Sequence, residues 1–265
     1  MRSHGQSAAV RSARPGACNI ARRLLGVASA AARKAACGRS CILDYVCDSR
    51  CLMLVKWIVA TVPSNQRQAF AGSQQAWAPL AHCEGFLGQV GGWDQNGRGC
   101  LLGLWRDDRT YNRFMTLIHD AILADSEGPP PFSRLDITTS ASILRLPGAA
   151  PDAATALFDA RWMRVQDCTI APDQTTTFVA QVLRSRPARL AAVQAFCAGT
   201  VSAGEHHRFF NTTLWSAADA PAGPLPTIRS SQAPNAQVTE LIEYRVALEP
   251  SWRILPPPER ATALK

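Results

Sequence analysis

The sequence lacks any apolar run long enough to cross a bilayer as a helix. A spanning helix needs about 20 apolar residues, whereas the longest apolar stretch, residues 52–62, is interrupted by Lys56. A secretory signal, with its apolar core and small-residue cleavage site, is also absent. We therefore expect no membrane partner and a cytoplasmic location.

The short motifs that mark several enzyme classes are absent too. No G-x-G-x-x-G, P-loop, H-E-x-x-H or G-x-S-x-G pattern occurs in the chain. Dinucleotide-binding, nucleotide-hydrolysing, zinc-protease and α/β-hydrolase functions therefore lose most of their support.

Acidic residues are scarce in the first 52 positions. Residues 1–52 contain nine Lys and Arg against two Asp and Glu, whereas residues 53–265 contain 19 against 18. The net charge of +8 thus belongs to the start of the chain, and the rest has no basic surface suited to a nucleic-acid partner. We expect residues 1–52 to be a disordered basic leader, or an untranslated one with the protein starting at Met53. An Arg- and Ser-rich transit peptide is the alternative.

Cysteines are present but form no framework. The nine cysteines are an odd number, and Cys37, Cys41, Cys47 and Cys51 lack the C-x2-C spacing typical of structural zinc. We expect buried free thiols, no metal site and no cofactor.

A repeated pattern is the most informative feature that is present. Two Gly-rich segments, residues 85–93 and 196–204, are each followed by a turn and a strand that ends in Leu-Trp. Self-similarity of this kind indicates a duplicated α+β unit.

The order of predicted elements supports this interpretation. Strands are expected at 54–62, 85–93, 100–105 and 135–144, with helices after the first and third. This βαββαβ order is that of a ferredoxin-like unit. The second copy has strands at 161–170, 196–204, 208–215 and 237–248, a helix at 176–194, and a degraded second helix at 220–234. The units span 53–146 and 161–256, separated by a Pro- and Ala-rich linker at 147–160 and followed by a tail at 257–265.

The first strand is apolar on both faces. Val55 and Trp57 alternate with Leu54 and Ile58, so both faces must be covered. We expect helices on one face and a second sheet on the other. Lys56 stands among these apolar residues, and it either points into the space between the sheets or reaches the solvent near the strand's end.

Several segments of the first unit resemble the YdbC-like family of uncharacterised bacterial proteins. They are residues 53–57, 75–77, 85–93 and 114–120. The family is similar to the dimeric α/β-barrel superfamily, which includes the antibiotic-biosynthesis monooxygenases. The resemblance implies two ferredoxin-like sheets packed face to face, closed within one monomeric chain or between two chains of a homodimer.

The resemblance also implies a pocket between sheet and helices for a small, flat, apolar molecule. Some members of the superfamily oxidise polyketide-like phenols without metal or flavin. Others bind and degrade haem through a helix-borne His with a nearby Asn, and residues 54–62 offer no Asn. The haem-degrading set is therefore not reproduced.

His119 is the predicted catalytic residue, since an imidazole suits proton transfer, and a rim histidine bonded to its neighbours is the alternative. Trp77, Gln89, Trp93 and Trp105 are the predicted ligand-binding residues; tryptophans can instead fill the core, and a buried amide can bond to backbone.

The leading hypothesis is a small-molecule-binding protein with cofactor-independent monooxygenase-like activity. A non-catalytic structural or regulatory barrel and a haem-binding protein are the alternatives.

Overall fold

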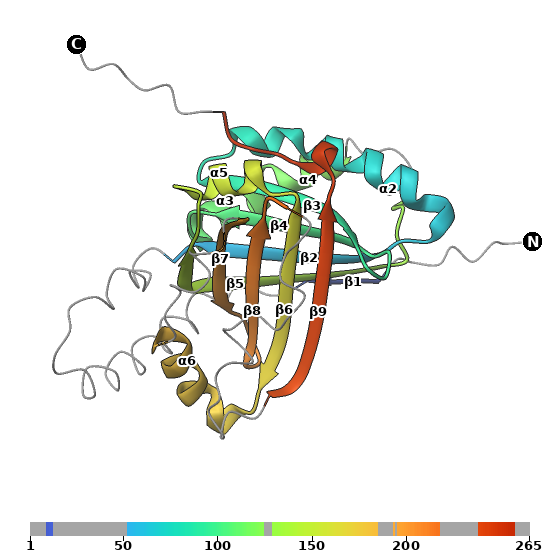
Figure 1. Ribbon diagram of the computed structural model, residues 1–265. Coiled ribbons are helices and arrows are strands. Elements are labelled where there is room, and N and C mark those ends of the chain that lie inside the picture. Colours follow the sequence, from blue (N-terminus) through green and yellow to red (C-terminus); the bar gives the residue numbers. More distant parts are fainter. Residues whose placement is uncertain are drawn as a thin grey trace, which may run out of the picture.

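The computed structural model describes residues 9–12, 52–124, 129–184, 193, 195–217 and 238–257. Eight antiparallel strands in these ranges form a closed barrel in the order β5-β2-β4-β3-β9-β6-β8-β7, with β7 pairing back to β5. Figure 1 shows the helices packed on the outside of this barrel. The architecture is α+β, and one chain closes the barrel.

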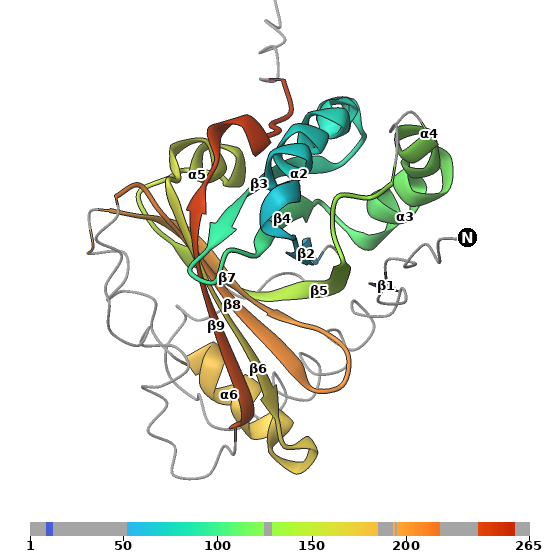
Figure 2. The same cartoon turned by 90° about the vertical axis from the view of Figure 1, so that its right-hand side faces the viewer.

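The first half of the barrel is a four-stranded sheet. Its strands are β2 (Leu54–Thr61), β3 (Phe86–Asp94), β4 (Gly99–Trp105) and β5 (Arg134–Pro147). Its helical segments are η1 (Ser64–Gln66), α2 (Arg67–Ser73), the 3₁₀ segment η2 (Gln74–His82), α3 (Asp108–Leu117) and α4 (His119–Ala124). Figure 2 shows α2, α3 and α4 on the outer side of this sheet.

The second half of the barrel repeats the strand order of the first. Its strands are β6 (Trp162–Ile170), β7 (Phe196–Ala203), β8 (Arg208–Trp215) and β9 (Val238–Leu248). The short segment η3 (Pro172–Gln174) leads into α6 (Thr175–Arg184). The remainder of the helix predicted at 176–194, and the degraded helix predicted at 220–234, fall outside the described residues except for isolated positions.

The apolar interior of the barrel explains why strand β2 is apolar on both faces. Val55 and Trp57 belong to one buried cluster with Val165 and Tyr244 of the opposite sheet. The rings of Trp57 and Tyr244 meet edge to face, with centroids 5.3 Å apart. Leu54, on the other face, packs under the helices. The expectation of helices on one face and a second sheet on the other is confirmed.

The long strand β5 joins the two sheets because it pairs with both. Its first half pairs with β2 and its second half with β7, with a register shift between Ser142 and Leu144. Buried hydroxyls line this junction, where Ser140 bonds to Ser202 at 2.8 Å and Ser142 to Thr200 at 2.7 Å. Each hydroxyl finds a partner as the strand passes from one sheet to the other.

The opposite junction, between β3 and β9, explains part of the glycine-rich pattern. Only three residues of each strand pair here, including Gly92 with Leu248. A Cβ at Gly92 would collide with the carbonyl oxygen of Ala247. The close approach of the two backbones therefore requires glycine at this position.

The segment 147–160, predicted as a linker, contains a short helix. Helix α5 (Ala153–Asp159) begins at Asp152, whose carboxylate accepts a hydrogen bond from Thr155 N at 2.8 Å. Ala156 and Leu157 are fully buried in the barrel cluster. The Pro- and Ala-rich composition predicted a linker, and it gave no indication of this short helix with its Asp152 cap.

The end of the described chain packs back on the first sheet. After η4 (Pro250–Trp252), Ile254 exchanges backbone hydrogen bonds with Gln89 of β3. At the other end, β1 (Ala9–Ser12) lies parallel to β5. Of the rest of the predicted leader, the structure describes only Leu52, which is buried in the core. None of the helices that the structure describes is both long and apolar enough to span a membrane.

Candidate functional site

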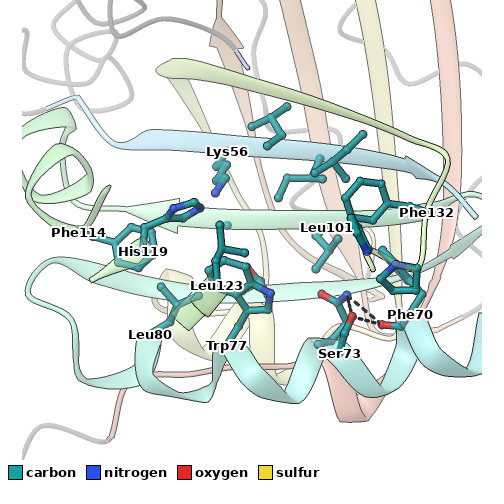
Figure 3. Close-up of a pocket in the computed structure, with 18 of the residues that line it drawn as sticks. Lys56, Phe70, Ser73, Trp77, Leu80, Leu101, Phe114, His119, Leu123 and Phe132 are labelled. Atoms are coloured by element: carbon teal, nitrogen blue, oxygen red, sulfur yellow. Dashed lines mark hydrogen bonds between the residues drawn. The ribbon is translucent and has the colours of Figure 1, made fainter. Parts of the chain in front are cut away.

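A cavity of about 460 Å³ lies between the first sheet and its helices. Figure 3 shows strands β2 and β4 behind it and the helical segment that carries Trp77 in front. Its walls are mostly apolar and aromatic; they include Ile58, Phe70, Trp77, Leu80, Leu101, Trp105, Phe114, Leu123, Pro129, Pro130, Pro131, Phe132, Leu135 and Ile137. Ligand sites commonly combine such walls with a few placed polar groups.

The floor of the cavity is a row of three residues on neighbouring strands. Lys56 of β2 is opposite Gly103 of β4, and Gly103 is opposite Gln89 of β3. A Cβ built on Gly103 would stand 3.7 Å from Lys56 Cβ and 3.8 Å from Gln89 Oε1. The glycine thus leaves a gap in the sheet surface, with an amine on one side and an amide on the other.

Lys56 points into this cavity, as Figure 3 shows. Its position corrects both sequence expectations, since the side chain enters neither the space between the sheets nor the solvent at the strand's end. Burial lowers the pKa of the amine from 10.5 to about 8. Its Nζ lies 5.6 Å from the centre of the Tyr111 ring.

Gln89 is buried and has spare hydrogen-bonding capacity. Its backbone N–H and carbonyl are used by Ile254, but its side-chain Nε2 has no partner among the described residues. Gln74, another buried amide lining the cavity, instead donates from Nε2 to the carbonyl of Phe70 at 3.1 Å and to Ser73 Oγ at 3.3 Å. The Oε1 atom of Gln89 is the one nearest the gap at Gly103, so this amide is suited to accept a hydrogen bond from a ligand hydroxyl.

His119 also lines the cavity, at the break where α3 ends and α4 begins. Its ring packs between Trp77 and Phe114, with centroids 5.6 and 5.8 Å away. Its Nδ1 lies 2.9 Å from the exposed carboxylate of Asp120. His119 therefore lines the cavity, as predicted for a site residue, and it also contacts the neighbouring Asp120, as the alternative interpretation predicted.

The structure brings together four of the five predicted site residues. Trp77, Gln89, Trp105 and His119 line one cavity. Trp93 lies outside that lining and packs against Phe70 and Trp252 instead. The cause is the position of Trp93 near the end of β3, where Trp252 of η4 packs against it.

The described part of the lining contains no Asp or Glu. Among these described residues, Lys56 therefore has no lining carboxylate to neutralise it. The described residues also contain no cluster of His, Cys, Asp and Glu that could hold a metal ion. Cys83, Cys100, Cys168 and Cys197 are free.

Lys56 is the charged cavity residue that the sequence reasoning did not select. A signal was present, because lysine occurs only at positions 34, 56 and 265 although Lys and Arg together number 28. Within the residues that the structure describes, Lys56 is the only lysine, and arginines make up the rest of the Lys and Arg residues. Arginine stays protonated, whereas a buried lysine can lose its proton and react, so a lone lysine in an apolar strand is a chemical signal.

Comparison with known proteins places the resemblance on this same part of the chain. Residues 54–139 match the family model described as DUF4937, a domain of unknown function. The chain is 29% identical over 90 residues to the uncharacterized protein YdbC of Bacillus subtilis strain 168, covering 32% of this chain and 76% of that protein. The predicted resemblance to YdbC-like proteins is confirmed.

Solved structures support the fold over a longer stretch. A candidate monooxygenase from Lactobacillus acidophilus NCFM aligns with a TM-score of 0.55 and 9% identity, covering 77% of this chain and 96% of that one. A second candidate monooxygenase, from Fusobacterium nucleatum, aligns with a TM-score of 0.55 and 8% identity, covering 74% of this chain and 92% of that one. An anthrone oxidase-like protein aligns with a TM-score of 0.51 and 11% identity, covering 75% of this chain and 91% of that one. At these identities the likeness shows the fold, which is that of monooxygenase-like proteins.

Proposed function

We propose that the cavity on the first sheet binds a small, planar, largely apolar molecule that carries an oxygen atom. The observation that supports this most directly is the row Lys56, Gly103 and Gln89 beneath aromatic walls. The apolar walls would hold the rings, and the gap at Gly103 would accept the oxygen. Lys56 Nζ would donate a hydrogen bond to it, and where the oxygen belongs to a hydroxyl, that hydroxyl would donate to Gln89 Oε1, the amide atom nearest the gap.

Cofactor-independent oxidation is the reaction that we propose for such a ligand. Direct reaction with O₂ requires an electron-rich anion of the substrate, and a nearby ammonium stabilises that anion. Lys56 supplies the charge, while His119 is a side chain able to accept the proton. For anthrone, a suitable planar probe, the balanced reaction consumes one O₂ and yields anthraquinone and one water.

Binding is tested by calorimetric titration with 2-naphthalenemethanol, which has flat rings and one hydroxyl. Gly103→Leu should weaken binding at least tenfold, about 1.4 kcal/mol, because its side chain would fill the gap. Gly103→Ala is the matched control, since its Cβ makes ordinary contacts, and it should change the affinity less than threefold. Equal affinity of the wild type and Gly103→Leu would refute the site.

Catalysis is tested separately, with an oxygen electrode and anthrone. Uptake above the uncatalysed rate that falls in both Lys56→Met and His119→Ala would support the oxidase. Binding of the aromatic probe with no oxygen uptake from anthrone would favour the alternative, a non-catalytic binding or regulatory barrel.

Haem binding fits the lining residues less well. His119 could offer a ring nitrogen to iron, but haem carries two carboxylates, and Lys56 is the one cation among the described lining residues. We therefore assign no chemistry to haem. A Soret band on mixing with haem that is lost in His119→Ala would overturn this judgement.

We also infer that the chain consists of two tandem ferredoxin-like units. The support is that both sheets have the same strand order, with the first strand between the third and fourth. A barrel closed by one chain needs no second copy, so sedimentation should show a monomer. A homodimer is the other outcome.

A further inference from the structure

The floor of the cavity can do more than bind an oxygen atom. We propose that Lys56 captures aromatic aldehydes and ketones covalently, as an imine formed at its side-chain nitrogen. This inference rests on the proposed function, because it requires that planar apolar molecules enter the cavity. It adds a ligand class and a covalent step.

The first support is the placement of the amine. Lys56 Nζ faces a cavity with aromatic walls and, among the described lining residues, no carboxylate. A carboxylate partner would hold the ammonium form and suppress its reactivity. The aromatic Tyr111 ring nearby gives at most a weak cation–π attraction.

The second support is the amide across the gap. Gln89 is 6% exposed and lines the cavity, and its Oε1 is the amide atom nearest the gap. A carbonyl group seated over Gly103 would place its carbon toward Lys56. The hydroxyl of the carbinolamine that forms on attack would then donate a hydrogen bond to Gln89 Oε1, which stabilises that intermediate.

The step balances without any redox partner. The neutral amine of Lys56 adds to the carbonyl carbon, and the oxygen takes up the proton that the nitrogen loses, giving a carbinolamine. The nitrogen lone pair then expels the hydroxyl group, which leaves as water after protonation. His119, an imidazole on the same cavity, can supply and recover that proton. The net change is one imine formed and one water released.

Burial makes the reactive form of the amine available. A pKa of about 8 leaves roughly a tenth of the amine unprotonated at pH 7, several hundredfold more than the ordinary value allows. The titratable groups on the helices over Lys56 are Tyr111 of α3 and His119 of α4. Burial raises the pKa of Tyr111 to about 12, so it stays neutral in this range.

The test is reductive trapping in the full-length protein. Wild type is incubated with 2-naphthaldehyde and cyanoborohydride, and the labelled site is found by peptide mass mapping. We expect the adduct at Lys56 to form at least tenfold faster at pH 7 than adducts at Lys34 and Lys265, at a rate that rises through about pH 8. The N-terminal amine, whose ordinary pKa is also near 8, is mapped on its own peptide. Lys56→Arg and Lys56→Met should lose that adduct while keeping wild-type circular dichroism.

An exposed lysine supplies the matched control. Arg109→Lys places an ordinary amine on the exposed side of α3, where labelling should be at least tenfold slower at pH 7 and rise only toward pH 10.5. Equal labelling of Lys56 and this surface lysine at pH 7 would overturn the proposal.

The two proposals fail in different ways. If 2-naphthalenemethanol binds but 2-naphthaldehyde leaves no adduct on Lys56, covalent capture is wrong and the binding site stands. If the alcohol does not bind and Lys56 is not labelled, both are wrong.

Discussion

The amine of Lys56 loses hydration in the cavity, and this loss lowers the stability of the folded protein while the amine is charged. The folded protein has a pKa of about 8 at this group, below the unfolded value of 10.5. Between these values the unfolded chain binds more protons, so stability rises with pH across that window. Below pH 8 the full penalty applies, and above 10.5 it vanishes.

We therefore predict that Lys56→Met stabilises the protein at pH 7 by on the order of 2 kcal/mol. The gain should shrink between pH 8 and 10.5. Urea unfolding at pH 7 and pH 10 measures it. Arg109→Met removes an exposed cation and should change stability by less than about 0.5 kcal/mol at either pH. A loss of stability in Lys56→Met at pH 7 would contradict the prediction.

The two buried amides of the cavity should respond in opposite directions to the same substitution. Gln89→Leu removes an unpaired N–H, so stability should stay level or rise by up to about 1 kcal/mol. Gln74→Leu breaks bonds to Phe70 and Ser73 and should cost about 1 kcal/mol. Only Gln89→Leu should also weaken the binding of 2-naphthalenemethanol markedly. Thermal unfolding and calorimetry check both parts.

Single residues could be predicted from the sequence where their local pattern was informative. His119 follows Met115 by four residues, so helical periodicity predicted it at the edge of the apolar stripe. It lines the cavity even though the helix breaks between α3 and α4 just before it. Lys56 could not be placed in the same way. The side of a strand that a residue faces follows from alternation, but only the covering helices decide whether that side holds a cavity or a filled core.

Strands and helices differ in how well the sequence predicted them. The strands of both sheets begin and end within a few residues of their predicted limits, because apolar runs and turns delimit them. The helix predicted after the first strand is instead α2 followed by the 3₁₀ segment η2, which contains Pro79. Helix α5 was missed because its apolar residues are too few to show a period.

Helix α5 is nevertheless predicted to be essential to the barrel. Leu157 is fully buried and belongs to the cluster between the sheets, so Leu157→Ala should cost about 2–5 kcal/mol. Phe158, the next residue, is 57% exposed, and Phe158→Ala should cost less than about 1 kcal/mol despite its larger side chain. Urea unfolding of both variants compares them. Similar losses would mean that α5 does not support the core.

At the scale of the whole molecule, the duplicated sequence suggests two domains, but the shared interior argues for one folding unit. Neither sheet has a core of its own on its inner face, because Trp57 of one meets Tyr244 of the other. The strand order shared by the two sheets could be predicted from the sequence. The mutual burial could not, because it depends on how β5 and β9 join the sheets.

Cooperativity therefore provides the last test. Trp57→Ala should lower the free energy of unfolding by about 3–5 kcal/mol, and hydrogen exchange should rise together in β2 and in β6, on opposite sheets. A cavity-lining change on the outer face, Leu80→Ala, should instead raise exchange first in η2 and the helices that cover the first sheet. If Trp57→Ala loosens β2 and leaves β6 protected, the two halves unfold independently. In that case the duplicated units are separate domains after all, joined at the barrel seams without sharing their stability.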